Sequence, residues 1–325
     1  MMGSSPSTAP KAGELVIGAS TSSLISRLAR SIAMEFKAGD EIVVTDVDHE
    51  ANISPWRRLE DRGLIIRTWR LNRDTLSLEI DDLTRLLSDR TRLVCFTHAS
   101  NILGEIMPIA DITRIVHAHG ARVCVDGVAY APHRALDVRA WEVDFYTFSL
   151  YKVYGPHCAV LYCRQASLDS LANLNHLFMD AYQGTGKLEP GAFPYELLYG
   201  AAGVPDYLAE LGGKVEPDGL VPAAYRGILE QEQRLNSRLL DFLRSRPDVE
   251  IMGPRGDDPH NLPTVSFTVG DLDSSSVPPI CDRHGIGIRW GHFYAPQLID
   301  ALGLTARDGV VRVSMVHYNT EEEVD

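Results

Sequence analysis

The amino-acid sequence predicts an α/β protein: a mostly parallel sheet with helices on both faces, followed by a smaller C-terminal α+β domain. Between residues 14 and 163, short apolar runs typical of buried strands alternate with amphipathic helical patterns, and this alternation favours a parallel sheet. From residue 165 the alternation stops, and a loop-rich stretch leads into two helical segments and four further strand-like runs. A chain of 325 residues is long enough to form both units.

The expected elements of the large domain follow one another in order. Strand-like runs occupy residues 13–20, 41–46, 64–71, 92–98, 121–126, 143–149 and 157–163. Helical patterns occupy residues 23–36, 54–63, 80–90 and 110–120. Asp81 or Asp82 suits the first turn of the third of these helices, and Gly120 suits the end of the fourth. In such sheets ligands bind beyond the carboxyl ends of the strands, so polar residues at these ends are the first candidates for a site.

The C-terminal part has a different organisation. Residues 165–200 are expected to be rich in loops, and helices are expected at residues 201–211 and 224–245. Strand-like runs follow at residues 249–253, 264–269, 286–289 and 310–318. We therefore expect a disordered lead-in at residues 1–12, a large domain at residues 13–244 and a small domain at residues 245–325.

Composition excludes several classes of function. The net charge of −13 argues against nucleic acid as a partner, because phosphate binding needs a basic face. No apolar run approaches the roughly 18–20 residues of a membrane helix, and no signal peptide is visible. The five cysteines show no spacing typical of a metal site, and we expect buried thiols in a reducing, cytoplasmic protein without a metal.

One lysine and one aspartate carry the strongest chemical signal. Lys152 follows the strand-like run that ends near Ser149, and Asp126 ends the run RVCVD. A lysine and an acid at strand ends are what a pyridoxal-phosphate enzyme needs: the amine forms the Schiff base, and the acid keeps the pyridine nitrogen protonated. Each residue alone is a weak signal, since most lysines after strands are solvated and Asp126 alone suits a helix cap.

Further residues meet the other demands of this cofactor. The segment Gly18–Ser22 opens a helix and supplies small residues and free N–H groups for a phosphate. His49 could stack on the cofactor ring. Arg312 and Arg289 are candidates for holding a substrate carboxylate, because a guanidinium binds a carboxylate with two hydrogen bonds. All but the two arginines are expected at one edge of the predicted sheet.

The chain resembles the class V aminotransferases, which are fold type I pyridoxal-phosphate enzymes, and in particular their cysteine-desulfurase-like subgroup. The strings that carry the resemblance run from residue 14 to residue 325 and are TDVDHEANISPW, THASNILGEIMPI, VDGVAYAPHRALDV, VDFYTFSLYKVYGPH, LEPGAFPYE and RVSMVHYNTEEEVD. Together these motifs are very specific, and they cover nearly the whole chain.

The resemblance implies a role for each matching position. Lys152 would form the Schiff base, Asp126 would contact the pyridine nitrogen and His49 would stack on the ring. Phosphate would be bound by Ser20 and Ser149, with help from the backbone of Thr21.

Two more positions concern the substrate. Asn101 would contact the cofactor or the substrate carboxylate, and Arg312 would bind that carboxylate. The substrate implied is a small L-amino acid or a cysteine S-conjugate, and a homodimer is implied because family sites form at a subunit interface.

The sequence departs from the family pattern at four places in the site. Gly191-Ala192 stands where the family has the Gly-Thr that reaches the phosphate of the partner subunit. Ala129 replaces a glutamine that contacts the phenolic oxygen of the cofactor, and Tyr151 replaces the histidine before the lysine, where its hydroxyl could take that role. Tyr294 stands where desulfurases carry the cysteine that accepts sulfur. Since tyrosine cannot form a persulfide, we expect lyase, aminotransferase or epimerase chemistry that starts from the Lys152 aldimine without a persulfide cysteine.

Two alternatives remain at this point. Relative to the family, the chain is expected to be truncated at both ends, and with Ala129, Ala192 and Tyr294 this suggests an inactive homologue that keeps the fold. A nucleotide-binding α/β protein is the second alternative, although GASTSS lacks both G-x-G-x-x-G and the P-loop lysine.

Overall fold

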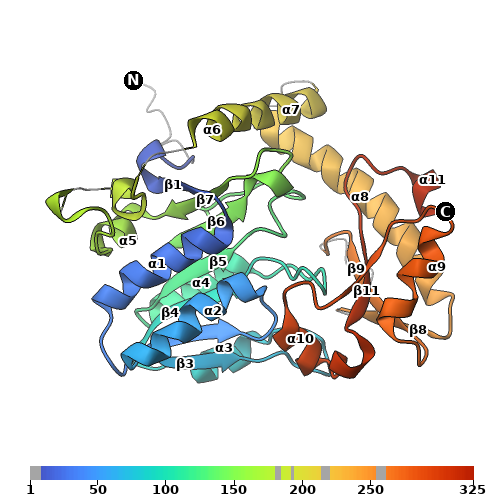
Figure 1. The fold of residues 1–325 in the computed structure, drawn as a ribbon, viewed down its shortest axis with the longest axis horizontal. Coiled ribbons are helices and arrows are strands. Elements are labelled where there is room, and N and C mark those ends of the chain that lie inside the picture. The colour runs from blue at the N-terminus through green and yellow to red at the C-terminus, as the bar shows by residue number, and fades with distance from the viewer. Residues whose placement is uncertain (1–8, 180–183, 192–193, 214–219, 254–260) are drawn as a thin grey trace.

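The computed structural model describes residues 9–179, 184–191, 194–213, 220–253 and 261–325. Most of the expected lead-in, residues 1–8, lies outside these ranges. The fold has a large α/β part and a smaller sheet that lies to one side of it, with the C-terminus in the smaller part (Figure 1). In the described part of the chain, no helix is long and apolar enough to span a membrane.

The large sheet has the predicted seven strands. They are β1 (Leu15–Gly18), β2 (Glu41–Thr45), β3 (Ile65–Trp69), β4 (Thr91–Thr97), β5 (Arg122–Asp126), β6 (Phe145–Ser149) and β7 (Ala159–Cys163). Their order is β1-β7-β6-β5-β4-β2-β3. Strands β3, β2, β4, β5 and β6 pair in parallel, and β7 is antiparallel to both β6 and β1. The prediction of a mostly parallel sheet is confirmed.

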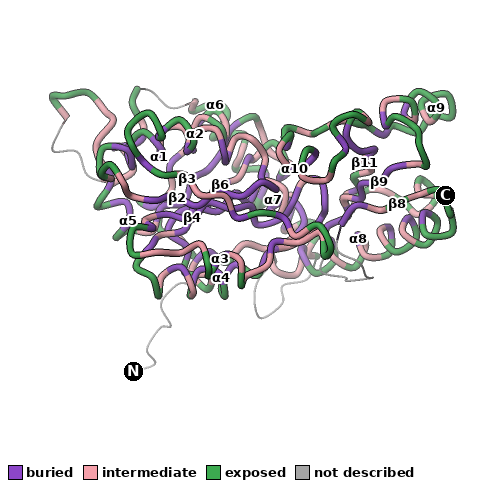
Figure 2. Tube along the Cα trace, turned by 90° about the horizontal axis from the view of Figure 1, so that it is seen from below, coloured by how far each residue is buried: buried purple, intermediate pink, exposed green. Residues whose placement is uncertain are grey.

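Helices cover both faces of this sheet (Figure 2). The helices on one face are α1 (Thr21–Glu35), α2 (Ser54–Arg57) and α5 (Gln165–Ser170), and those on the other are α3 (Ile80–Leu86) and α4 (Ile109–Ala118). The side chains of β2 point alternately to the two faces of the sheet. Ile42 and Val44 pack with the buried residues of α1, and Val43 packs with those of α4. Burial on both faces explains why these strands are almost wholly apolar.

The start of α1 is encoded locally. The Ser20 hydroxyl accepts a hydrogen bond from the Ser23 N–H, and the Ser23 hydroxyl accepts one from the Ser20 N–H, each at 3.2 Å. This capping box begins the helix one residue after Ser20. The apolar face of α1, which includes Leu24 and Leu28, is fully buried against the sheet. Helix α1 is thereby held with its N-terminus at the carboxyl edge of the sheet.

The smaller sheet has the order β10-β11-β9-β8. Its strands are β8 (Val249–Met252), β9 (Thr264–Val269), β10 (Arg289–Gly291) and β11 (Val310–Ser314). Helices α9 (Pro278–Asp282) and α11 (Glu321–Val324) pack with this sheet, whereas α10 (Pro296–Ala301) packs in the core of the large part. Helices α6 (Tyr195–Ala201), α7 (Gly203–Gly212) and α8 (Leu220–Arg244) lie between the two sheets along the chain.

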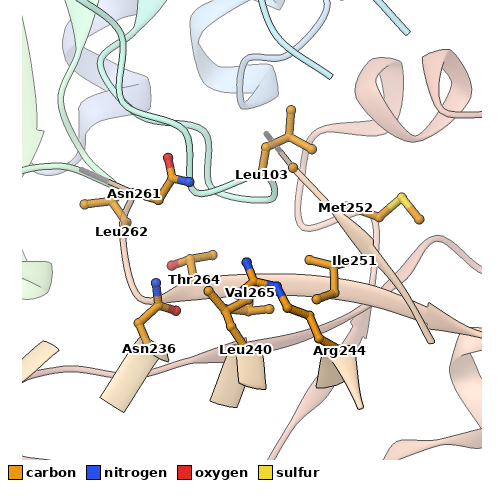
Figure 3. A pocket seen from close by; sticks show the side chains of 11 residues that line it. Leu103, Asn236, Leu240, Arg244, Ile251, Met252, Asn261, Leu262, Thr264 and Val265 are labelled. Carbon is orange, nitrogen blue, oxygen red and sulfur yellow. The ribbon is translucent and has the colours of Figure 1, made fainter. Parts of the chain in front are cut away.

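Helix α8 packs against both parts of the molecule. Its first half, with Tyr225 and Ile228, packs in a cluster with Val153 of the large part, and its second half, with Leu235 and Leu239, packs on the small sheet. A cavity of about 180 Å³ lies where α8, β8, β9 and the Leu103 loop meet (Figure 3). A domain boundary at residue 245 stays a prediction, although α8 contacts both sides of it.

Several expected elements differ from the structure; for example, the helix expected at residues 80–90 ends at Leu86 and the strand expected at residues 310–318 ends at Ser314. The helix expected at residues 54–63 is the single α-turn of α2 followed by a 3-10 helix (Arg58–Arg62), which Gly63 ends in the left-handed conformation. The stretch 165–200 holds the short helices α5 and α6, which are too short to show a periodic pattern. The strand expected at residues 286–289 begins only at its last residue, Arg289.

A buried aromatic cluster supports the turn after β5. The Tyr146 hydroxyl is hydrogen bonded to His98 Nδ1 at 2.8 Å, and the His98 ring stacks on Tyr130 with centroids 3.4 Å apart. Gly127 follows Asp126 at this place, and a Cβ on Gly127 would lie 2.1 Å from the Tyr146 hydroxyl oxygen. Only glycine fits here while Tyr146 keeps its position.

We expect the substitution Gly127→Ala to lower the free energy of unfolding by about 1–3 kcal/mol, because Tyr146 would have to leave its packed position. Urea denaturation followed by circular dichroism measures the change. Gly203→Ala is the matched control, since a Cβ at Gly203 meets nothing within 4 Å and helix α7 begins there. Its free energy of unfolding should stay the same or rise. Equal losses in the two variants would contradict this account.

Candidate active site

A cavity at the carboxyl ends of the central strands brings the predicted cofactor residues together. Its lining includes every residue for which the sequence predicted a cofactor contact: Ser20, Thr21, His49, Asn101, Asp126, Ser149, Tyr151 and Lys152. A second, wider cavity shares Asn101, Tyr151 and Lys152 with the first and adds Arg312. Their individual roles remain predictions, but their proximity is a property of the fold.

One end of the cavity is built from hydroxyl groups at the N-terminus of α1. Thr21 is the first helical residue, and its hydroxyl lies 2.8 Å from the Ser149 hydroxyl at the end of β6. Both side chains are buried, and Ser20 and Ser22 line the same end. The positive end of a helix dipole together with small hydroxyl residues forms a site suited to a phosphate.

Asp126 lines the same cavity and is buried at the end of β5. Its Oδ1 accepts a hydrogen bond from the Val128 N–H at 2.9 Å. Burial raises the pKa of Asp126 to about 6, and the Val128 N–H and the charge of Lys152 only partly oppose this rise. A carboxylate in this position would be stabilised by a cationic partner such as a protonated pyridine nitrogen.

Lys152 lies on a 3-10 helix (Leu150–Lys152) between β6 and β7. It lines both cavities and is exposed in the protein without a ligand. Partial burial lowers the pKa of Lys152, and the positive charge of Arg312 lowers it further, whereas Asp126 acts in the opposite direction. A larger share of this amine is therefore neutral, which is the form that attacks a carbonyl or accepts a proton.

His49 is held in one tautomer. Its Nδ1 accepts a hydrogen bond from the Ala51 N–H at 3.1 Å, so the ring proton is on Nε2. Burial lowers the pKa of His49 to about 4, and the charge of Lys152 adds to this effect. The ring stacks on Tyr294 with centroids 5.3 Å apart. His49 is thus a neutral, oriented ring at the cavity wall.

The structure distinguishes the two arginine candidates, because only one of them lines a cavity. Arg312 and Arg289 are direct partners across β11 and β10. Arg312 lines the wider cavity, donates a hydrogen bond to the Asn101 carbonyl at 2.9 Å and lies 3.8 Å from the centroid of the Phe293 ring. Burial lowers the pKa of Arg312 to about 10. Arg289 is exposed, lines neither cavity and donates to the Ile288 carbonyl.

Sequence reasoning missed Asp48, which supports the cavity from behind. Its side chain is fully buried and accepts hydrogen bonds from Asn52 Nδ2 at 2.7 Å, from the Thr97 N–H at 3.1 Å and from the Thr45 hydroxyl. Burial raises the pKa of Asp48 to about 7, and the nearby charge of Asp126 adds to the rise. The signal was present in the string DHEAN, where Asp48 precedes His49.

The residues of the cavity fit pyridoxal phosphate. A phosphate fits the hydroxyl groups and free N–H groups at the start of α1, a pyridine nitrogen fits the Asp126 carboxyl, and a carbonyl fits the Lys152 amine. The departures expected from the sequence are present too: Ala129 lines both cavities, and the Tyr151 ring stacks on His157 with centroids 5.0 Å apart.

Comparison with known proteins agrees with this geometry. A family model described as "Aminotransferase class-V" matches residues 8–325. An aminotransferase-like protein of Gibberella zeae, FGM3, is 42% identical over 96% of this chain and 76% of its own length. The cysteine desulfurase-like protein UstD of Aspergillus flavus is 36% identical over 96% of this chain and 71% of its own length.

A solved structure extends the comparison to the fold. The cysteine desulfurase CsdA of Escherichia coli superposes with a TM-score of 0.85 at 26% identity, covering 98% of this chain and 77% of the other. The fold and the cavity are those of a pyridoxal-phosphate-dependent enzyme of fold type I. The chain belongs to the class V aminotransferase family, among relatives of the cysteine-desulfurase-like type.

We expect Asp126→Asn to stabilise the cofactor-free protein above pH 6 by an amount on the order of 2 kcal/mol. The pKa of Asp126 is raised to about 6 in the folded protein, so its contribution to stability is present at low pH and is lost as the pH rises from about 4 to 6. The gain from Asn should therefore vanish near pH 4. Chemical denaturation at several pH values measures it.

Asp144→Asn is the control, because its expected effect on the free energy of unfolding at neutral pH has the opposite sign. Hydrogen bonds from His117, Ser167 and the Val123 N–H keep the pKa of Asp144 below its ordinary value despite burial. Its contribution to stability is present at neutral pH and is lost on acidification, so Asn should destabilise the protein at neutral pH. The same sign in both variants would contradict the assignment.

Proposed function

We propose that this protein acts on an L-amino acid or a cysteine S-conjugate, with lyase-type chemistry at the substrate side chain preferred slightly over transamination. The observation that supports this most is the Lys152 amine, whose pKa is lowered, in the same cavity as the buried Asp126 carboxyl. Bound pyridoxal phosphate supplies an electron sink that stabilises negative charge at the substrate α-carbon.

The side chains of this chain divide the remaining work. Lys152 Nζ is the group that attaches the cofactor and takes the α-proton, a role that its increased neutral fraction favours. Arg312 binds the substrate carboxylate beside Asn101 and is not neutralised by an ion pair with any described carboxylate. The neutral His49 ring limits rotation of the bound ring system by stacking.

The cysteines of this chain support chemistry without a persulfide. Four of them, Cys95, Cys124, Cys158 and Cys163, are buried, and Cys281 lies on helix α9 of the small part. The loop between β10 and α10 presents the exposed Tyr294 next to His49. A phenol cannot accept sulfur from a substrate, so sulfur transfer through this loop is not part of the proposal.

Lys152→Ala tests the attachment of the cofactor. We expect purified protein with pyridoxal phosphate to show a visible absorbance band, and borohydride reduction followed by peptide mapping to find the adduct on Lys152. The Lys152→Ala variant should lose the adduct, and Lys37→Ala, which alters an exposed lysine outside the cavities, should keep it. An adduct of unchanged amount in Lys152→Ala would refute the assignment.

Exchange of the substrate α-proton in deuterated water separates an active enzyme from an inactive homologue. A panel of L-amino acids followed by proton NMR should include at least one whose α-proton exchanges only when Lys152 is present. No exchange with any amino acid, in protein that does form the Lys152 adduct, would favour the inactive homologue.

Arg312→Lys tests the carboxylate site. We expect KM for the amino acid to rise by about 10- to 100-fold with a smaller change in kcat, because lysine cannot form the paired hydrogen bonds of a guanidinium. Arg289→Lys, on the neighbouring strand position and outside both cavities, should leave KM unchanged. A larger effect from Arg289→Lys would assign the carboxylate to the other arginine.

A further inference from the structure

A histidine–carboxylate pair lies in the wall of the wider cavity, apart from the residues that the proposed function uses. His133 Nδ1 lies 2.7 Å from Oε1 of Glu232, a residue of helix α8. Arg134 Nη1 donates to the second oxygen of Glu232, also at 2.7 Å. Since a carboxylate only accepts, Nδ1 donates this hydrogen bond, and in the neutral ring Nε2 is the nitrogen with the free lone pair.

Hydrogen bonds from two tyrosines fix the backbone that precedes His133. The Tyr154 hydroxyl donates to the Pro132 carbonyl at 2.6 Å, and the Tyr225 hydroxyl donates to the Ala131 carbonyl at 2.8 Å. His133 and Glu232 are 7% and 1% exposed, so the pair is shielded from competing water. A side chain with this many restraints has a defined direction.

The second ring nitrogen of His133 is available to a ligand. Nε2 makes no hydrogen bond with any residue that the structure describes. It is also not enclosed by other atoms, since it is absent from the buried polar atoms that lack a partner. His133 lines the same cavity as Lys152 and Arg312. Because the two ring nitrogens point in different directions and Nδ1 points to Glu232, the edge with Nε2 is the one presented to the cavity.

The chemistry of the cavity limits what can meet this nitrogen. Its volume is about 580 Å³, and its described lining includes Lys152 and Arg312 but neither Asp nor Glu. With Arg312 paired to the substrate carboxylate, the described lining has no Asp or Glu to balance a cationic substrate side chain. An anionic side chain has no proton to donate to the lone pair that Nε2 carries in the neutral ring. A neutral group with an O–H, of which a hydroxyl is the smallest, satisfies both conditions.

We propose that His133, oriented by Glu232, determines substrate specificity by accepting a hydrogen bond at Nε2 from a hydroxyl on the substrate side chain. The inference rests on the proposed function, because the substrate must first be held at Lys152 and Arg312. It adds the class of substrate: an L-amino acid with a neutral, hydroxyl-bearing side chain. His133 and Glu232 would otherwise serve only to attach α8 to the turn after β5, and the experiment separates these two roles.

The experiment measures equilibrium binding to the enzyme with pyridoxal phosphate. The cofactor absorbance is titrated with pairs of L-amino acids that differ in a hydroxyl: serine and alanine, threonine and valine, tyrosine and phenylalanine. In at least one pair we expect the hydroxyl-bearing member to bind about tenfold more tightly, which corresponds to about 1.4 kcal/mol. His133→Phe should reduce this preference to less than twofold.

Two further variants provide the controls. His133→Gln should keep part of the preference, because its amide can donate to Glu232 while its oxygen accepts from a ligand. His117→Phe removes another histidine–carboxylate pair, in which Nε2 lies 2.8 Å from Asp144, on helix α4 and outside the cavity. It should leave the preference intact. Circular dichroism shows whether each variant is folded, and if His133→Phe is not, His133→Gln decides.

The outcomes are distinct. A hydroxyl preference that survives in His133→Phe, or no preference in any pair for the wild-type protein, overturns the proposal about His133 and leaves the Lys152 adduct untouched. Absence of the adduct instead overturns the proposed function and, with it, this inference. A preference lost equally in His117→Phe shows a general loss of structure and also refutes a specific role for His133.

Discussion

The pairing of strands β4, β5 and β6 places Thr97, Asp126 and Thr147 side by side, because Asp126 is the Cα partner of both threonines. This backbone pairing sets where the cavity lies. Ser149 and Lys152 follow Thr147 along the chain, so they arrive at the same edge as Asp126. A shift of one residue in this register would turn Asp126 to the other face of the sheet, and no side-chain interaction could compensate for it.

Burial at this edge raises the pKa of the two carboxyl groups and lowers the pKa of the three basic groups, because it disfavours the charged form of each. The charged forms of Asp126, Asp48, Lys152, Arg312 and His49 are all disfavoured by loss of contact with water. The protein without cofactor therefore holds several groups away from their preferred charge state. A ligand with a cationic ring nitrogen and an anionic phosphate would relieve part of this cost, and so would stabilise the fold that binds it.

Helix α8 connects the two parts of the molecule to the cavity. Its first half contributes Tyr225 and Glu232 to the support of the Ala131–His133 turn, while its second half forms the core of the small sheet. The small sheet in turn carries Arg312. A movement of the small part would therefore change the distance between Arg312 and Lys152 and would also stress the contact between Glu232 and His133.

The sequence by itself determined the alternation of strands and helices, the start of α1 at its capping box and the residues that end the strands. These are local properties: the apolar run of β2 and the hydroxyl cap at Ser20 each lie within a few residues of the chain. The family resemblance added candidates for each role, and the cavity contains all of those predicted to contact the cofactor.

Only the tertiary structure decided which long-range partners these residues have. By residue type alone Arg289 and Arg312 are both candidates for the substrate carboxylate, and only Arg312 lines the cavity, whereas Arg289 is exposed. Glu232 gave no signal in the sequence, and Asp48 gave only its place in the string DHEAN, because their significance comes from His133 and Thr97, which are distant in the sequence. Burial, and with it the direction of each pKa shift, arises from packing between elements that no local pattern contains.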